Sequence, residues 1–133
     1  YIEKYHSTFG HDFYAFEFGG VHWIVINALL FNSGLAGEER QKNWLDEQFA
    51  TQKGRVFVFL HYPPYVYEPG ERSSYENIDE PGRSWLLDRL RRPGVEAVFA
   101  AGGVERELRP ACLPVPRRFY LRFYLEQLTR CLP

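Results

Sequence analysis

The sequence predicts an α/β domain. Apolar runs of strand type at residues 21–27, 56–60 and 95–100 are separated by segments with helical spacing at residues 38–50 and 81–92. Strand-like and helix-like segments that alternate along a chain are typical of α/β folds. The run at 56–60, V-F-V-F-L, has no polar interruption, so we expect a strand that is buried on both faces of a parallel sheet.

From length and composition we expect a soluble chain that forms one domain or part of one. The 133 residues include 16 basic and 17 acidic residues, and this balance argues against a surface built for nucleic acid or anionic membrane. The richest apolar run, at residues 21–31, is too short for a membrane span, which needs about 20 residues. Cys112 and Cys131 fit neither a zinc site nor a disulfide framework. Because the chain starts with Tyr1 rather than methionine, we expect its start to be a cut within a longer protein.

The N-terminal part of the chain predicts a β-hairpin. Residues 14–18, Y-A-F-E-F, and residues 21–27, V-H-W-I-V-I-N, flank the dipeptide Gly19-Gly20. Both central residues of a two-residue hairpin turn take positive φ angles, which glycine adopts without steric cost. For His22, early in the second run, we expect a half-exposed strand residue rather than a ligand.

The segments at 38–50 and 81–92 predict helices that pack on the sheet, because their apolar residues recur at helical spacing. The side chains expected to face the sheet are Trp44, Leu45 and Phe49 of the first helix and Trp85, Leu86 and Leu90 of the second. Arg89, Arg91 and Arg92 fall in the last turn of the second helix, where cations meet the negative end of the helix dipole. We ascribe this basic cluster to the dipole rather than to phosphate binding.

His61 ends the apolar run at 56–60 and is followed by two prolines. In open α/β sheets, ligands bind in the crevice outside the carboxyl ends of the strands. Pro63 and Pro64 restrict the backbone of the exit, so the imidazole is held with few alternatives. The sequence therefore predicts a ligand-binding position at His61.

A long loop at residues 65–80 separates this strand from the second helix. Loops longer than about 12 to 15 residues are uncommon in compact domains and often functional. The tyrosines in and next to this loop are Tyr62, Tyr65, Tyr67 and Tyr75. Such side chains either stack on a base or a sugar ring or pin the loop to its own domain, and the sequence leaves both readings open.

In their order and spacing, four stretches resemble the C-terminal half of the calcineurin-like metallophosphoesterases. The stretches are F-G-H-D-F-Y-A-F-E-F-G-G-V-H-W-I-V-I-N at 9–27, Q-K-N-W-L-D-E-Q-F at 41–49, V-F-V-F-L-H-Y-P-P at 56–64 and V-E-A-V-F-A at 95–100. We assign residues 1–102 to the C-terminal part of such a domain. The resemblance implies part of a two-layer sheet flanked by helices, with the hairpin at its N-terminal end.

In that family two divalent metal ions, Fe, Mn or Zn, bind a phosphoester and activate the attacking water. Such ions neutralise the phosphate charge and lower the pKa of the bound water. The resemblance implies that His61 is a metal ligand and that Tyr62 and Tyr65 are neighbours of a phosphoester substrate. The other ligand motifs of the family, D-x-H, G-D-x-x-D, G-N-H-D/E and G-H-x-H, are absent, and no histidine follows His61. We therefore expect no catalytic residue and no stably bound metal in this chain.

From residue 103 the character of the sequence changes. The tail at 103–133 is rich in arginine, proline and leucine, contains both cysteines and no lysine, and ends the resemblance. Three interpretations stay open: a divergent natural ending with an amphipathic helix near 117–130, an altered reading frame, or an interaction arm.

The resemblance leads to a functional hypothesis and an alternative. The first is a fragment of a metal-dependent phosphoester hydrolase, a phosphatase or phosphodiesterase, that is inactive as an isolated chain. The alternative is a non-catalytic remnant or a binding module that uses the aromatic loop at 62–75 and loses binding when Tyr65 and Tyr67 are replaced. Half of a two-layer fold also leaves one sheet face uncovered, and an exposed apolar face of that size favours aggregation.

Overall fold

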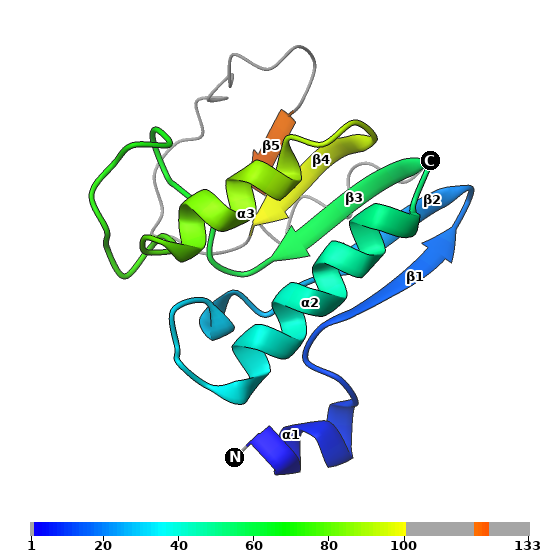
Figure 1. Cartoon of the computed structure of the whole chain (residues 1–133), viewed down its shortest axis with the longest axis horizontal. Coiled ribbons are helices and arrows are strands. Elements are labelled where there is room, and N and C mark those ends of the chain that lie inside the picture. Colours follow the sequence, from blue (N-terminus) through cyan, green and yellow to red (C-terminus); the bar gives the residue numbers. More distant parts are fainter. Residues whose placement is uncertain (1, 101–118, 123–133) are drawn as a thin grey trace.

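The computed structural model describes residues 2–100 and 119–122 (Figure 1). Its elements are α1 (Ile2–Phe9), β1 (Tyr14–Phe18), β2 (Val21–Val25), the short 3-10 helix η1 (Ala28–Leu30), α2 (Ala36–Thr51), β3 (Arg55–Leu60), α3 (Gly82–Leu90), β4 (Val95–Ala100) and β5 (Phe119–Arg122). The strands form a mixed sheet in the order β1-β2-β3-β4-β5. This arrangement confirms the predicted α/β class. Along the described residues, no helix combines the length and apolarity needed to cross a lipid bilayer.

The hairpin of β1 and β2 forms as the sequence predicts. The two strands pair antiparallel, with Phe18 opposite Val21, and Gly19 and Gly20 have φ angles of 61° and 73°. Both glycines therefore occupy the left-handed region that a primed two-residue turn requires. The turn fixes the register of the strands, and thereby which side chains of β1 face the helices.

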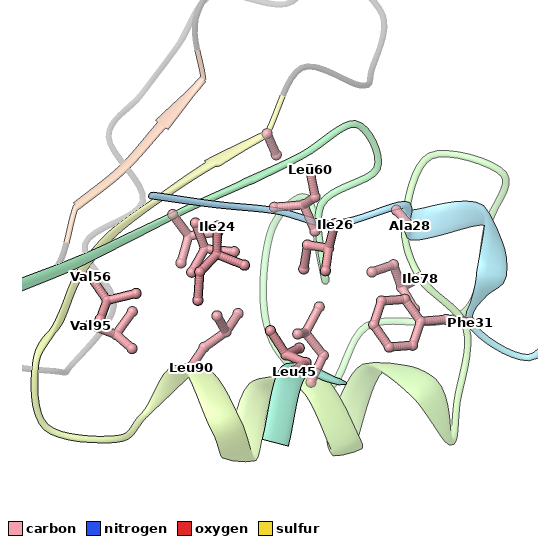
Figure 2. Packing of buried hydrophobic residues seen from close by; sticks show 14 residues of the cluster. Ile24, Ile26, Ala28, Phe31, Leu45, Val56, Leu60, Ile78, Leu90 and Val95 are labelled. Carbon is pink, nitrogen blue, oxygen red and sulfur yellow. The ribbon is translucent and has the colours of Figure 1, made fainter. Parts of the chain in front are cut away.

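Both helical crossovers lie on the same face of the sheet. The strands β2, β3 and β4 run parallel, and α2 and α3 connect them in turn (Figure 1). Figure 2 shows the resulting core, in which strand side chains point toward the helices. Its buried residues include Ile24, Val58 and Val98 from the sheet, and Leu45 and Leu86 from the helices. Burial of each such side chain contributes roughly 1.5 to 3 kcal/mol to the stability of the fold, relative to leaving the side chain exposed.

The face of the sheet opposite α2 and α3 carries aromatic rings. We call it the aromatic face; it consists of Phe16, Trp23, Phe57, Phe59 and Phe99. Neighbouring ring centroids lie 4.6 to 6.0 Å apart, a range typical of favourable aromatic pairs. Phe16 is 47% exposed, whereas the other four residues are half-buried.

The prediction that strand 56–60 is buried on both faces is therefore wrong. Val56, Val58 and Leu60 are buried under the helices, but Phe57 and Phe59 are only half-buried. Both phenylalanines point to the face that neither α2 nor α3 covers. The uninterrupted apolar run indicated that water is excluded from the strand. It did not reveal whether helices cover a face or whether stacked aromatic rings shield that face only in part.

A bidentate ion pair joins α2 and α3. The Arg89 guanidinium donates to both carboxylate oxygens of Asp46, at 2.9 and 3.2 Å, and lies 3.8 Å from the centroid of the Trp85 ring. A planar guanidinium combines these two contacts, which an ammonium group cannot do equally well. Asp46 neutralises the charge of Arg89, and Trp85 covers its guanidinium, so Arg89 does not present a phosphate site.

The carboxylate of Glu38 organises the turn that leads into α2. It accepts hydrogen bonds from the backbone N–H groups of Asn32 (2.9 Å) and Gly34 (3.0 Å), two residues with positive φ angles. Lys42 donates to the same carboxylate at 2.6 Å. The Lys42 hydrogen bond, supported by these backbone donors and opposed by burial, lowers the pKa of Glu38 to about 2.

Other features differ from the sequence predictions or were not foreseen. His22 is 7% exposed and its Nε2 lies 3.0 Å from Gln48 Oε1. The expectation of a half-exposed residue is therefore wrong, because α2 covers this position.

The predicted helix near 117–130 is contradicted at Phe119–Arg122, which pairs parallel with β4. The rest of that tail lies outside the described residues. Phenylalanine and tyrosine favour strands, and pairing satisfies the backbone groups along β4. The helix α1 at Ile2–Phe9 was not predicted from the sequence.

We expect Glu38→Gln to lower the free energy of unfolding at pH 7 by roughly 1 to 3 kcal/mol. A carboxyl whose pKa is lower in the folded state stabilises the protein above its ordinary pKa and loses that contribution as the pH falls. The difference between wild type and variant should therefore shrink from pH 4.5 toward pH 2. Urea unfolding at several pH values measures it. Glu39→Gln, at a carboxylate that is 75% exposed, is the matched control and should change stability little.

Candidate functional site

The candidate site lies at the carboxyl edge of the parallel strands. His61 follows the last residue of β3 and is exposed, as the sequence predicts for a ligand position. The hydrogen bond from Ile26 N to Phe59 O, at 2.9 Å, extends the pairing between β2 and β3 to this edge. Asn27, the next residue after Ile26, therefore lies at the same edge as His61.

The two predicted substrate neighbours differ in their surroundings. Tyr62 is half-buried against the core, and its ring meets the His61 imidazole edge-on, with centroids 4.9 Å apart at an interplanar angle of 83°. Tyr65 is only 6% exposed, so its ring packs in the interior. The structure thus brings His61 and Tyr62 together at the surface. It gives Tyr65 a packing role, and the predicted contacts of both tyrosines with substrate stay predictions.

A half-buried carboxylate, that of Glu71, shapes the loop that follows His61. Glu71 accepts hydrogen bonds from the N–H groups of Val66 (2.7 Å) and Tyr67 (2.8 Å) and from Asn77 Nδ2 (2.6 Å). Burial alone would raise the pKa of Glu71, but these hydrogen bonds, with one from the N–H of Glu68, outweigh it and hold the pKa below its ordinary value. The loop is therefore folded around a charged centre.

Arg83, in the first turn of α3, ties this loop to the helix. Its side chain is 1% exposed, and Nε donates to the carbonyl of Ile78 at 2.9 Å. Nη1 donates to the carbonyls of Glu71 and Pro69. A guanidinium with several fixed donors satisfies loop carbonyls that would otherwise be costly to bury. Neither Glu71 nor Arg83 was predicted from the sequence, since neither lies in a motif and their partners are mostly backbone atoms.

A second polar cluster lies beside the carboxyl end of β2. Asp12 accepts a hydrogen bond from Asn27 Nδ2 at 2.8 Å, and its other carboxylate oxygen lies 2.8 Å from His6 Nε2. Burial would raise the pKa of Asp12, but the hydrogen bonds of Asn27, His6 and its own backbone N–H lower it below the ordinary value. The cluster anchors the segment before β1 to the end of β2. This cluster was not predicted from the sequence.

Comparison with known proteins shows what this chain is similar to. It is 32% identical to the mouse serine/threonine-protein phosphatase CPPED1 over 80% of the chain, and 32% identical to the zebrafish protein of the same name over 74%. The human protein of that name is 29% identical over 80% of the chain. The chain is homologous to these phosphatases. No family model matches it.

The homology to the CPPED1 phosphatases is partial on their side. The chain spans 38% of the length of the mouse and human proteins and 34% of the zebrafish protein. Most of each phosphatase sequence therefore lies outside the region that aligns with this chain. These relatives are named as phosphatases, which agrees with the prediction of a phosphoester hydrolase. The activity in that name belongs to the relatives as whole proteins.

The described residues do not by themselves fit a two-metal centre. No group of three or more histidine, cysteine, aspartate or glutamate side chains in the described part of the chain is placed to hold a metal ion. The closest approach to a ligand pair is His6 with Asp12, and those two side chains already bond each other. Dinuclear centres need several carboxylate and imidazole ligands on each ion. We therefore derive no step through a metal ion in this chain.

We expect Glu71→Gln to loosen the loop without unfolding the sheet. The neutral amide removes the charge that the N–H groups of Val66 and Tyr67 stabilise, so their hydrogen-exchange protection should fall roughly tenfold or more. Amide exchange measured by NMR tests this, with Val58 in β3 as an internal reference. Glu68→Gln, which changes an exposed side chain of the same loop, is the control. Unchanged protection in Glu71→Gln would show that the carboxylate does not organise the loop.

Proposed function

We propose that this chain is the C-terminal part of a metal-dependent phosphoester hydrolase of the calcineurin-like metallophosphoesterase family. The observation that carries the proposal is the homology to serine/threonine-protein phosphatases over 80% of the chain. The phosphoester of phosphorylated serine or threonine is then the substrate class of the whole protein. A phosphodiester is the other class that the sequence resemblance allows.

His61 is the metal ligand in this proposal. Its exposed imidazole lies at the carboxyl end of a central parallel strand. At this edge α/β sheets present their ligand-binding groups. A pair of Fe, Mn or Zn ions would supply charge neutralisation of the phosphate and an activated water. Tyr62, which packs edge-on against His61, would orient the ring and border the substrate.

The aromatic face is consistent with the same proposal. A parallel sheet is normally covered on both faces, whereas α2 and α3 cover one face here. The family has a second sheet layer, and the relatives are longer than this chain, with 38% of the mouse protein matched. We propose that this second layer packs on Phe57, Phe59 and their neighbours in the whole protein. The remaining metal ligands would come from that layer.

The chain alone should lack phosphoesterase activity. We expect no turnover of p-nitrophenyl phosphate or bis-p-nitrophenyl phosphate above the metal-only rate when Mn²⁺, Zn²⁺ or Fe²⁺ is added, because one imidazole does not hold two ions. The proposal further requires activity when the missing segment of a relative is supplied in one polypeptide with this chain, and its loss in His61→Ala. Metal-dependent turnover by the chain alone that disappears in His61→Ala would contradict the first expectation. Turnover of the extended protein that His61→Ala leaves unchanged would refute the role of His61.

The exposed tyrosines of the loop favour one second candidate, a binding module. Tyr67 and Tyr75 are 68% and 79% exposed, so their rings are open to stacking on a nucleobase or a sugar. In that case AMP should bind saturably without metal, and Tyr67→Ala should weaken binding by roughly tenfold. Calorimetric titration measures it. Tyr65 is buried, so Tyr65→Ala tests folding instead, and Tyr5→Ala, at an exposed ring on α1, is the control.

A further inference from the structure

The strand β1 forms an open edge of the sheet as far as the described strands extend. It pairs with β2 on one side and is the first strand in the sheet order. Most of its residues are exposed. Natural edge strands are commonly protected by charged side chains, above all lysine, by proline or by a β-bulge. Y-A-F-E-F has one charged residue, Glu17, and no lysine or proline, and its pairing with β2 is regular. The edge is thus able to accept another strand.

The hairpin fixes which backbone groups face outward. In a two-residue hairpin the residues next to the turn, here Phe18 and Val21, form a hydrogen-bonded pair. Hydrogen-bonded and non-hydrogen-bonded pairs alternate along an antiparallel ladder. The N–H and C=O groups of Ala15 and Glu17 therefore point away from β2, at the open edge.

Side chains of the strand make this edge complementary to itself. Tyr14, Phe16 and Phe18 lie on the same face and are 47%, 47% and 74% exposed. If a second copy pairs antiparallel about Phe16, Tyr14 of each copy lies opposite Phe18 of the other. Aromatic side chains directly opposite each other stabilise antiparallel strands.

Backbone and charge also fit this register. Ala15 of each copy lies opposite Glu17 of the other, which places the outward N–H and C=O groups face to face. The register keeps the two Glu17 carboxylates from lying directly opposite each other, an arrangement that would be destabilising. Glu17 is already close to His22, with Oε1 3.9 Å from Nδ1.

We propose that two copies of this chain associate through β1, antiparallel and two-fold symmetric, with Phe16 at the axis. The interface is isologous, because the same residues face each other from both copies. Pairing joins the two sheets into one and makes the aromatic faces continuous. This inference is independent of the proposed hydrolase function, since it rests on β1 alone.

The first test measures the mass of the full chain in solution. Sedimentation velocity over a range of concentrations should show a monomer–dimer equilibrium, and Phe16→Lys should raise the dimer dissociation constant by roughly tenfold or more, because a charged side chain at the axis meets its own copy. Tyr67→Lys makes the same exchange at an exposed ring far from β1 in sequence and should leave the constant within roughly twofold. Far-UV circular dichroism verifies that both variants are folded.

The second test reads the register. In a chain with Cys112 and Cys131 replaced by serine, Phe16→Cys places two thiols in a non-hydrogen-bonded pair, with Cα atoms about 4.5 Å apart, which a disulfide spans. With oxidised glutathione this variant should form a covalent dimer. The Phe18→Cys thiols would lie about 14 Å apart and should not.

Two results would overturn the proposal. One is a monomer at all concentrations together with no covalent dimer of Phe16→Cys. The other is a dimer that Phe16→Lys leaves unchanged, or that forms disulfides equally in Phe16→Cys and Phe18→Cys, because association would then involve another surface.

Discussion

The burial of β3 beneath α2 and α3 is the constraint on which the rest of this structure depends. Val58, with 0% exposure, lies under the helices, so the alternation of the strand sends Phe57 and Phe59 to the opposite face. Parallel partners on both sides fix the direction of the strand. Its carboxyl end, and with it His61, must therefore open at the edge where an α/β sheet presents its ligand-binding loops. The packing of β3 against α2 and α3 thus determines the helix-covered core, the aromatic face and the position of the candidate ligand.

The parts of the fold that depend on local pattern were predictable. The two glycines gave the hairpin, the helical spacing of residues such as Leu45 gave the helices, and the apolar runs gave three of the strands. What failed depended on tertiary context: a strand pattern does not reveal how many faces helices cover, nor that α2 buries His22. At the candidate site the sequence predicted the place of His61 at the end of β3, and its role as a metal ligand stays a prediction. Glu71 escaped because its partners are mostly backbone N–H groups, which leave no trace in residue spacing.

The polar networks around the candidate edge hold its backbone rather than perform chemistry. Glu71 and Arg83 fold the loop after His61, and Asp12 fastens the segment before β1 to Asn27 at the end of β2. Arg83 is buried, Glu71 and Asp12 are half-buried, and each has several hydrogen bonds, as a charge withdrawn from water requires. The exposed His61 imidazole, framed by such supports, fits a domain whose homologues are phosphatases and are much longer than the matched region. It does not fit a complete active site in the described residues.

The most direct test of this account follows the His61 imidazole during a Zn²⁺ titration of the full chain, by proton–nitrogen correlation NMR. We predict that its ring resonances shift only weakly, with a dissociation constant in the millimolar range, because the described residues place no group of three or more candidate ligands around a metal ion. Micromolar or tighter binding at His61, with two ions bound per chain, would contradict it.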